Sequence, residues 1–308
     1  MLIKEKYKIQ LIEENILFEE GIHTEEKILN ADEVIKSPGI PDKVDIVKKC
    51  LAKNIPVISE IEFAARYTKA KLITITGSNG KTTTTLLIYH LLKSAGYKVG
   101  LGGNIGESFA KQVINDTFDY FVLELSSFQL DGMYKFKSDI AILLNITPDH
   151  LDRYDYNFQN YVNSKFRTLQ NMGSSEDFIY WQESEAIAAE LAKKVFPANH
   201  LPVSVEIEVK KGAFLKKGML IVRSKGEEFE ISQEELPLKG IHNAINSMCA
   251  ILVAQAVGID EKTIRNGLMT FKNASHRLEF VAEINGVKFI NDSKATNVDS
   301  VFYALGSF

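Results

Sequence analysis

A lysine and a threonine that close a glycine-rich turn are the residues of this sequence best suited to chemistry. Lys81 and Thr82 end the string T-G-S-N-G-K-T at positions 76–82. Residues 72–76 alternate β-branched and apolar side chains, which predicts a buried strand, and residues 82–93 have helical spacing. A glycine-rich turn between a strand and a helix points backbone N–H groups and the positive helix end at an anion. The string therefore predicts a phosphate-binding loop.

In such a loop the lysine reaches the β- and γ-phosphates of a nucleotide and the threonine hydroxyl binds Mg²⁺. We expect the loop residues to bind ATP: Gly77, Ser78, Asn79, Gly80, Lys81, Thr82 and Thr83. The string is shorter than the general pattern G-x-x-x-x-G-K-[ST], because position 75 is Ile75. An ordinary glycine-rich turn is the alternative, but it leaves the combination of strand, loop, lysine, threonine and helix unexplained.

A carboxylate at the end of a second strand is the candidate partner of this loop. Residues 120–125 form a near-continuous apolar run that includes Glu124, and α/β folds place ligands at the carboxyl ends of strands. Glu124 could complete the coordination of Mg²⁺ near Thr82, since Mg²⁺ prefers oxygen ligands. A solvated or paired charge is the alternative for a lone glutamate at a strand end.

The segment after the strand expected at 140–145 is rich in polar groups. Asp149, His150 and Asp152 cluster there, where a second metal or a substrate could be bound. Helix capping is the alternative for the Asp-His pair.

Asn243 and Asn246 stand one turn apart at the start of a helix expected over 242–257. They either cap that helix or contact a nucleotide base.

Cations flank a hairpin that an Asn-Gly turn at 285–286 predicts. Arg277 and Lys294 suit a triphosphate, and Asp292 can accept hydrogen bonds from ribose hydroxyls. A surface ion-pair network is the alternative, although a polar run directly after an apolar strand favours a site loop.

The elements that position these groups predict an α/β fold. Between residues 72 and 271 strands alternate with helices, which predicts a mostly parallel sheet covered on both faces. Residues 203–231 alternate in polarity between glycine turns and predict a small antiparallel patch. A chain of 308 residues accommodates about two domains.

Composition excludes several classes of protein. Hydrophobic residues at 45% and charged residues at 25% are typical of a globular protein, and the net charge of −4 argues against nucleic acid as a partner. Two cysteines predict neither a disulfide framework nor a zinc site. No apolar run approaches the ~20 residues that span a bilayer, and the start lacks a signal-peptide pattern, so we expect a cytoplasmic location without membrane insertion.

The order of the motifs resembles that of the Mur ligases from about position 37 to position 296. In sequence the motifs are G-S-N-G-K-T (77–82), G-N-I-G (103–106), E-L-S-S-F-Q-L (124–130), T-P-D-H-L-D-R (147–153), H-N-A-I-N (242–246), H-R-L-E (276–279) and N-D-S-K-A-T-N (291–297). The strings at 124–130 and 291–297 are similar to those of the branch that adds D-glutamate. Family members that add diaminopimelate or lysine, the dipeptide-adding enzyme and folylpolyglutamate synthase carry different strings there.

The resemblance implies ATP-dependent amide ligation in peptidoglycan precursor synthesis, and hence a part in cell-wall biogenesis, cell shape and cell division. ATP phosphorylates the carboxylate of UDP-N-acetylmuramoyl-L-alanine, and the amine of D-glutamate attacks the acyl phosphate. Phosphoryl transfer of this kind depends on positioning and charge neutralisation. The implied partners are these three substrates and two Mg²⁺ ions, and we expect a monomer.

The resemblance also implies roles for single residues. Lys81 and Arg277 stabilise the transferring phosphoryl group, and Thr82 with Glu124 holds one Mg²⁺. Glu124, His150 and Lys165 serve the second ion, with Lys165 carbamylated by CO₂; on its own Lys165 reads as a surface lysine of a helix. The remaining implied positions are Asn243, Asn246, Arg277, Asp292 and Lys294 for ATP, and Ser37, Pro38, Gly39, Asn104, Gln129 and Thr296 for the substrate.

Three domains are expected: a partial substrate domain at 1–69, an ATP-binding Mur ligase domain at 70–273, and the beginning of a Rossmann-like ligase domain at 274–308. The glycine-rich first turn of the family's uridine-binding unit is missing, and the D-glutamate-binding domain only starts. We therefore expect a chain truncated at both ends that forms no amide at a useful rate. Two alternatives stay open: a nucleotide-binding remnant without ligase activity, and another amide ligase of the Mur or folylpolyglutamate type.

Overall fold

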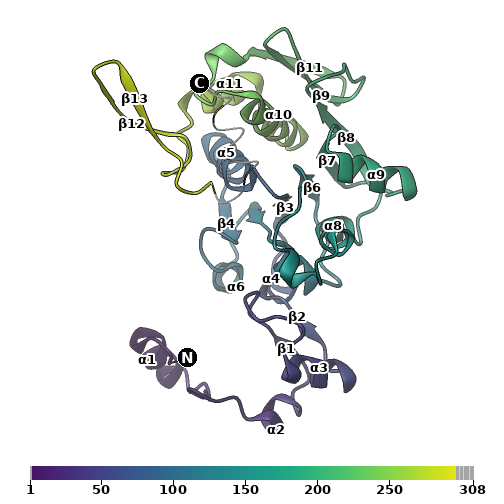
Figure 1. Ribbon diagram of the computed structural model, residues 1–308, viewed down its shortest axis with the longest axis vertical. Helices are drawn as coiled ribbons and strands as arrows, with labels where there is room; N and C mark the ends of the chain where they lie inside the picture. Colours follow the sequence, from purple (N-terminus) through teal and green to yellow (C-terminus); the bar gives the residue numbers. More distant parts are fainter. Residues whose placement is uncertain (1, 296–297, 299–300, 302–304, 306–308) are drawn as a thin grey trace.

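The computed structural model describes residues 2–295, 298, 301 and 305 (Figure 1). Within them the main element is a nine-stranded sheet with the order β11-β10-β9-β8-β7-β6-β3-β5-β4. Its strands are β3 (Lys71–Thr76), β4 (Val99–Gly103), β5 (Tyr120–Glu124), β6 (Ile140–Leu143), β7 (Asp177–Trp181), β8 (Asn199–Ser204), β9 (Gly212–Lys216), β10 (Met219–Ser224) and β11 (Glu227–Ser232). The predicted mostly parallel sheet is confirmed.

Strands β3 to β9 pair with one another in parallel. Strand β10 pairs antiparallel with both β9 and β11. The antiparallel patch expected at 203–231 is therefore one end of the large sheet. Strand β3 lies between β5 and β6, and the chain reaches β6 only after it has built β4 and β5 on the other side. Ligands bind at such a switch point, outside the carboxyl ends of the strands.

The two faces of β3 carry different side chains because its residues alternate. Ile73 and Ile75 pack into a core with α5 (Lys81–Ser94), α10 (Ile241–Ala256) and α11 (Glu261–Thr270). Thr74 and Thr76 face the opposite side and are fully buried. Helix α10 is apolar around most of its circumference, as expected of a helix that packs against β8, β9 and β10 as well as α5.

The opposite face of the sheet is covered by α8 (Phe158–Phe166) and α9 (Glu185–Lys193), whose Tyr161 and Ile187 share a core with Phe178 of β7. A third core gathers α4 (Glu60–Ala64), α6 (Phe109–Gln112) and α7 (Ser127–Asp131) beside β5. Both faces of the sheet are therefore covered, as the sequence predicted.

The N-terminal segment has a small core of its own. Its elements are α1 (Glu5–Glu13), α2 (Glu25–Ile28), β1 (Val34–Ile35), α3 (Asp45–Ala52) and β2 (Val57–Ile58). Strands β1 and β2 pair in parallel over Val47 and Cys50. Helix α1 buries none of its residues and lies at the lower end of the molecule in Figure 1. Glu62 of α4 anchors the segment, because its buried carboxylate accepts hydrogen bonds from three successive backbone N–H groups at 134–136.

The predicted hairpin forms from β12 (Glu279–Ile284) and β13 (Val287–Asn291). Its turn residues Asn285 and Gly286 have φ of 52° and 77°, which is the left-handed conformation that an Asn-Gly hairpin turn requires. The hairpin projects away from the sheet (Figure 1).

Candidate active site

The predicted phosphate loop connects β3 to α5. Gly80 has φ 85°, and a Cβ there would lie 2.7 Å from Asn246 Oδ1 and 3.2 Å from Leu144 Cδ1. Gly77 is enclosed in the same way, since its Cβ would lie 3.1 Å from the Asn145 carbonyl oxygen. Both glycines are therefore required by backbone conformation and by close packing.

The loop after β6 holds the phosphate loop in place. The Asn145 side chain brackets Asn79: its Oδ1 accepts from the Asn79 N–H at 2.8 Å, and its Nδ2 donates to the Asn79 carbonyl at 3.0 Å. The Ser78 hydroxyl donates to the Thr147 carbonyl at 2.9 Å and accepts from the Thr147 N–H. We did not predict this role for Asn145, although its place at a strand end was a signal.

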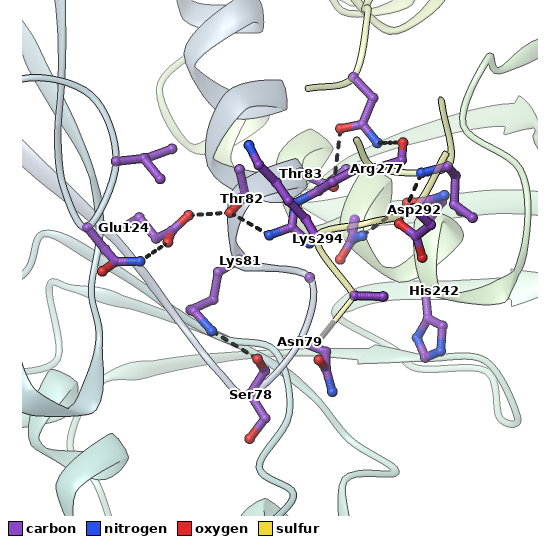
Figure 2. A pocket seen from close by; sticks show the side chains of 18 of the residues that line it. Ser78, Asn79, Lys81, Thr82, Thr83, Glu124, His242, Arg277, Asp292 and Lys294 are labelled. Atoms are coloured by element: carbon purple, nitrogen blue, oxygen red, sulfur yellow. Dashed lines mark hydrogen bonds between the residues drawn. The ribbon is translucent and has the colours of Figure 1, made fainter. Parts of the chain in front are cut away.

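A line of polar contacts crosses the start of α5. The Thr82 hydroxyl donates to Glu124 Oε2 at 2.8 Å, and Asn104 Nδ2 donates to Glu124 Oε1 at 2.7 Å. Arg277 donates from its NH2 group to Thr82 Oγ1 at 3.3 Å. Figure 2 shows Glu124, Thr82 and Arg277 joined in this way. Residues 195 positions apart are thus brought to one helix end, as the resemblance implied.

Lys81 points along the loop and donates to the carbonyl oxygens of Gly77 at 2.8 Å and Ser78 at 2.9 Å. Burial lowers the pKa of the Lys81 amine, and the carboxylates of Glu124 and Asp149 oppose this shift. The buried Nε of Arg277 has no hydrogen-bond partner in the described part of the chain. A phosphate group, with several acceptor oxygens, fits both cations.

These groups line one hollow, which we name the first cavity. Its walls are Ser78, Asn79, Gly80, Lys81, Thr82, Thr83, Asn104, Ile105, Glu124, Asp149, His150, His242, Asn243, Asn246, Asn273, Arg277, Leu278, Asp292, Lys294 and Ala295. All residues predicted for ATP are among them except Gly77.

The two predicted asparagines of α10 do not cap that helix. Asn243 Nδ2 donates to the Lys239 carbonyl, and Asn246 Nδ2 donates to Asn243 Oδ1 at 3.2 Å. Asn246 Oδ1 accepts from the Thr84 hydroxyl at 3.0 Å, so this side chain also supports the start of α5. The capping alternative is therefore wrong.

Asn273 is a cavity residue that sequence reasoning missed. Its Oδ1 accepts from the Thr83 hydroxyl at 3.2 Å, and its Nδ2 donates to the Arg277 carbonyl at 3.3 Å. It thereby joins helix α5 to the segment that carries Arg277. No local pattern around position 273 marks it, because its Thr83 partner is distant in sequence.

A second cavity adjoins the first and shares Lys81, Asn104, Asp149 and His150 with it. It is lined by Pro38, Gly39, Lys81, Asn104, Ser126, Ser127, Phe128, Asp149, His150, Tyr161 and Lys165. Two of the predicted substrate residues of the N-terminal segment, Pro38 and Gly39, are thus brought to the groups that sequence reasoning placed near a metal.

Lys165 is only 2% exposed, so the surface alternative for this lysine is wrong. Its Nζ donates to Thr76 Oγ1 at 3.1 Å and to the Gly77 carbonyl at 2.9 Å. Burial lowers the pKa of the Lys165 amine well below its usual value, and the nearby Lys81 cation lowers this pKa further. Burial also raises the pKa of the adjacent Tyr161 hydroxyl to about 12.

Two predicted substrate residues line neither cavity, and a third falls outside the described residues. Ser37 is exposed and lines neither cavity. Gln129 forms a capping box with Ser126, whose N–H donates to Gln129 Oε1 at 3.0 Å. Thr296 lies outside the described residues. Substrate contact stays a prediction for all three.

Two residues of the predicted metal site supply oxygen donors that suit a magnesium ion. Thr82 and Glu124 supply a hydroxyl and a carboxylate that already meet, which suits one Mg²⁺. His150 is exposed and lines both cavities. In the described part of the chain no three His, Cys, Asp or Glu side chains cluster as metal ligands. An unmodified Lys165 is no ligand for Mg²⁺, and only an added oxygen donor would make it one.

A phosphate loop at the switch point of a mostly parallel sheet defines a P-loop α/β nucleotide-binding protein. Comparison with known proteins narrows this class. The Mur ligase middle domain matches residues 75–254. The UDP-N-acetylmuramoylalanine--D-glutamate ligase of Bacteroides fragilis (strain ATCC 25285) is 53% identical over 305 residues, which are 99% of this chain and 68% of that protein. The chain belongs to the Mur ligase family, whose members are ATP-dependent amide ligases.

Solved structures share the fold. A pseudomurein peptide ligase type C from Methanothermus fervidus aligns with a TM-score of 0.63 at 20% identity, over 100% of this chain and 70% of that one. The MurF ligase from Thermotoga maritima in complex with ADP aligns with a TM-score of 0.61 at 18% identity, over 91% and 74% of the two chains. In the described part of the chain no helix has the length and apolarity needed to cross a membrane.

Proposed function

We propose that this chain acts in the ATP-dependent addition of D-glutamate to UDP-N-acetylmuramoyl-L-alanine. The observation that carries the proposal is the pair of adjoining cavities, which share Lys81, Asn104, Asp149 and His150. One cavity contains the phosphate loop, and the other contains the predicted substrate loop. A carboxylate in the second cavity would therefore approach a phosphate in the first.

The proposed reaction has two steps. A carboxylate oxygen of the muramoyl-alanine attacks the γ-phosphorus of ATP, and the bond from phosphorus to the ADP oxygen breaks. The amine nitrogen of D-glutamate then attacks the acyl carbon of this acyl phosphate. The amide forms as inorganic phosphate leaves with the former carboxylate oxygen, and the amine loses its protons to solvent.

The side chains of this chain neutralise and position the reactants. Lys81 and Arg277 donate to the oxygens of the transferring phosphoryl group, which is where charge develops. Asn243, Asn246, Asp292 and Lys294 line the part of the first cavity assigned to the nucleoside and the phosphates. Thr82 and Glu124 would hold Mg²⁺, which when bound neutralises phosphate charge.

Carbamylation of Lys165 follows from the same proposal. The free amine attacks CO₂, its nitrogen bonds to carbon and one proton leaves, so a neutral amine becomes an anionic oxygen donor. The lowered pKa of Lys165 favours this reaction, because it keeps the amine neutral. With His150 and Glu124 the carbamate would hold a second Mg²⁺.

The carbamate is tested by Lys165→Ala, with the exposed Lys111→Ala as the control. We expect Lys165→Ala to lose substrate-dependent ADP formation and to regain part of it when acetate is added. Full activity of Lys165→Ala without acetate would contradict the metal role of this residue.

The domain assignment extends the proposal to the whole chain. We propose a substrate domain at 1–69, an ATP-binding domain at 70–273 and the start of a ligase domain at 274–308. The separate core of the N-terminal segment and the projecting hairpin support these boundaries. The chain spans about two thirds of the length of its B. fragilis relative. The cytoplasmic location and the monomeric state stay predictions.

The decisive assay measures ADP formation by the 308-residue chain with ATP and Mg²⁺. We expect UDP-N-acetylmuramoyl-L-alanine to stimulate ADP formation, and the same compound without its alanine to be inactive. We expect no further stimulation by D-glutamate, because the chain should form no amide at a useful rate; phosphate release that rises with one member of a panel of amino acids would identify the acceptor. ATP binding without any stimulation would favour the alternative, a nucleotide-binding remnant.

A further inference from the structure

We propose that Arg153 is a positioning residue that fastens the substrate loop, residues 37–40, to the turn that begins at His150. The inference rests on the proposed function, since it concerns how the second cavity is kept in shape. Arg153 itself lines neither the first nor the second cavity. It acts on the substrate through the loop that it holds.

The Arg153 guanidinium makes three contacts at once. Its NH1 group donates to the Gly39 carbonyl at 3.3 Å and its NH2 group donates to the Pro38 carbonyl at 3.2 Å. Its central carbon lies 4.2 Å from the centre of the Phe128 ring. The edge of one planar cation therefore holds the loop while its face packs on helix α7, a combination that suits arginine.

The other hydrogen bonds of the substrate loop in the described part of the chain are made within the N-terminal segment. The Ile40 N–H donates to the Ser37 carbonyl at 3.0 Å, and Lys36 Nζ donates to the Ile40 carbonyl at 2.7 Å. Among residues 2–295, the hydrogen bonds from the central part of the chain to this loop come from Arg153. Loss of this side chain would therefore release the loop from the central part of the chain and let its own turn open more often.

The same side chain connects the loop to His150. Arg153 ends the 3-10 turn Leu151–Arg153, which His150 begins in a left-handed conformation with φ 51°. The rings of His150 and Phe128 lie 5.2 Å apart. Pro38, Gly39, Phe128 and His150 all line the second cavity. Movement of the loop away from Arg153 would therefore open the cavity beside His150.

Hydrogen exchange of the ligand-free chain tests the fastening directly. We compare the wild type with Arg153→Lys and Arg153→Gln by mass spectrometry, following peptides that cover 36–42, in which the Lys36 and Ile40 N–H groups are hydrogen-bonded. Lysine keeps the charge but cannot donate from a planar fork. We expect these amides to exchange on the order of tenfold faster in both variants, with exchange at 134–136 unchanged.

Arg265→Lys is the matched control, because Arg265 also lies over a ring, that of Phe229 at 4.8 Å, and donates to a backbone carbonyl, that of Glu230. It is on α11 beside the edge strand β11, far from the loop in sequence and in fold (Figure 1). Unchanged exchange at 36–42 in the Arg153 variants, or an equal rise in Arg265→Lys, would overturn the fastening role.

Steady-state kinetics test the consequence for the substrate. We expect Arg153→Lys to raise KM for UDP-N-acetylmuramoyl-L-alanine by about fivefold, with KM for ATP unchanged within about twofold. Faster loop exchange with an unchanged substrate KM would overturn the positioning role and leave the proposed function intact. Equal rises in both KM values would also overturn it, since a general loosening of the site affects both substrates.

Discussion

The first cavity is built by two parts of the chain that are held to very different degrees. The strand-end loops of the central sheet contribute Ser78, Lys81 and Glu124, each of which makes two or more side-chain hydrogen bonds within the site. The segment from 273 to 295 contributes Arg277, whose side-chain bond to Thr82 at 3.3 Å is long. The same segment contains the β12–β13 hairpin, whose larger apolar side chains are mostly exposed.

This difference matches two requirements of the site: the phosphate loop must be rigid, whereas the segment from 273 to 295 can rearrange. A phosphate loop works because its N–H groups and cation are already in place, so binding requires little reorganisation. The segment that carries Arg277 meets α5 through the Asn273 Oδ1, which accepts from the Thr83 hydroxyl at 3.2 Å, and through the long bond from Arg277 to Thr82. The Asp292 carboxylate accepts from the Leu278 N–H at 3.1 Å, inside the segment itself. Few contacts mean that local opening needs little free energy, and we expect this segment to move more readily than the loop.

The largest effect should come from a methyl group placed in the rigid part. Gly80→Ala adds a Cβ at 2.7 Å from Asn246 Oδ1 and strains a backbone with φ 85°, so we expect a loss of about 2–4 kcal/mol in the free energy of unfolding. Gly286→Ala is the control, since its φ of 77° is similar but its Cβ meets nothing within 4 Å.

Denaturant unfolding measures both glycine variants. We expect the hairpin variant to lose no more than ~1–2 kcal/mol, the backbone term alone. Equal losses in the two variants would show that packing around the phosphate loop contributes nothing.

The second effect compares a cation from each part. Lys81→Ala should weaken ATP binding by roughly 1.5–3 kcal/mol, because charge-assisted hydrogen bonds to phosphate are lost. Lys294→Ala should cost less, since Lys294 is exposed and its charge is screened by solvent. Titration calorimetry with ATP and Mg²⁺ decides, and equal affinity of the wild type and Lys81→Ala would contradict the assignment of the loop.

The third effect is a gain in stability. Lys165 has a lowered pKa in the folded chain, so the unfolded chain binds more protons at every pH between that lowered pKa and the ordinary 10.5. Stability of the wild type therefore rises with pH through this window. Lys165→Met removes the buried amine and should raise the free energy of unfolding by roughly 0.5–2 kcal/mol at pH 7.

Unfolding of Lys165→Met and the wild type at pH 7 and pH 9.5 in CO₂-free buffer checks this expectation. The stabilisation should shrink at the higher pH. A gain that is independent of pH would mean that lost packing strain, rather than the buried charge, accounts for it.

The smallest effect concerns the projecting hairpin. Phe280 is 59% exposed, so Phe280→Ser should change the free energy of unfolding by less than ~0.5 kcal/mol. Phe109→Ser is the contrasting variant, because Phe109 is fully buried against Phe121, and it should cost several-fold more. Thermal unfolding distinguishes them; a large loss for Phe280→Ser would mean that this ring packs on something in solution.

Local patterns predicted the parts of the site that local physics determines. The strand 72–76, the loop and the helix after it form as expected, because a β-branched run, two glycines and a helical apolar stripe each specify their own conformation. The Asn-Gly turn predicted its hairpin for the same reason. The resemblance to the Mur ligases implied that Glu124 lies with Thr82 and that Arg277 lies at the same phosphate site.

Contacts across the fold were not predictable in this way. Asn145 brackets Asn79 and Asn273 bonds to Thr83 because β6 and the end of α11 lie beside the loop. The strand-end place of Asn145 was a signal for a site residue, but it did not identify this partner, and nothing near Asn273 in sequence marks its bond to Thr83. Lys165 looked like a surface residue because its helix carries polar neighbours on its other faces. Its burial follows from α8 packing over Thr76, which the sequence alone does not place.

The central claim is that a carboxylate in the second cavity receives a phosphoryl group held in the first. UDP-N-acetylmuramoyl-L-alanine labelled with ¹⁸O in its carboxylate tests it, with the released phosphate analysed by mass spectrometry after incubation with the chain, ATP and Mg²⁺. Hydroxylamine is included, because its nitrogen attacks the carbonyl carbon of an acyl phosphate and leaves the bridging oxygen on phosphorus, whereas attack of water can break the P–O bond instead. We predict one ¹⁸O atom in the phosphate formed per substrate-dependent turnover. ADP formation that depends on the substrate but yields only unlabelled phosphate would contradict the account.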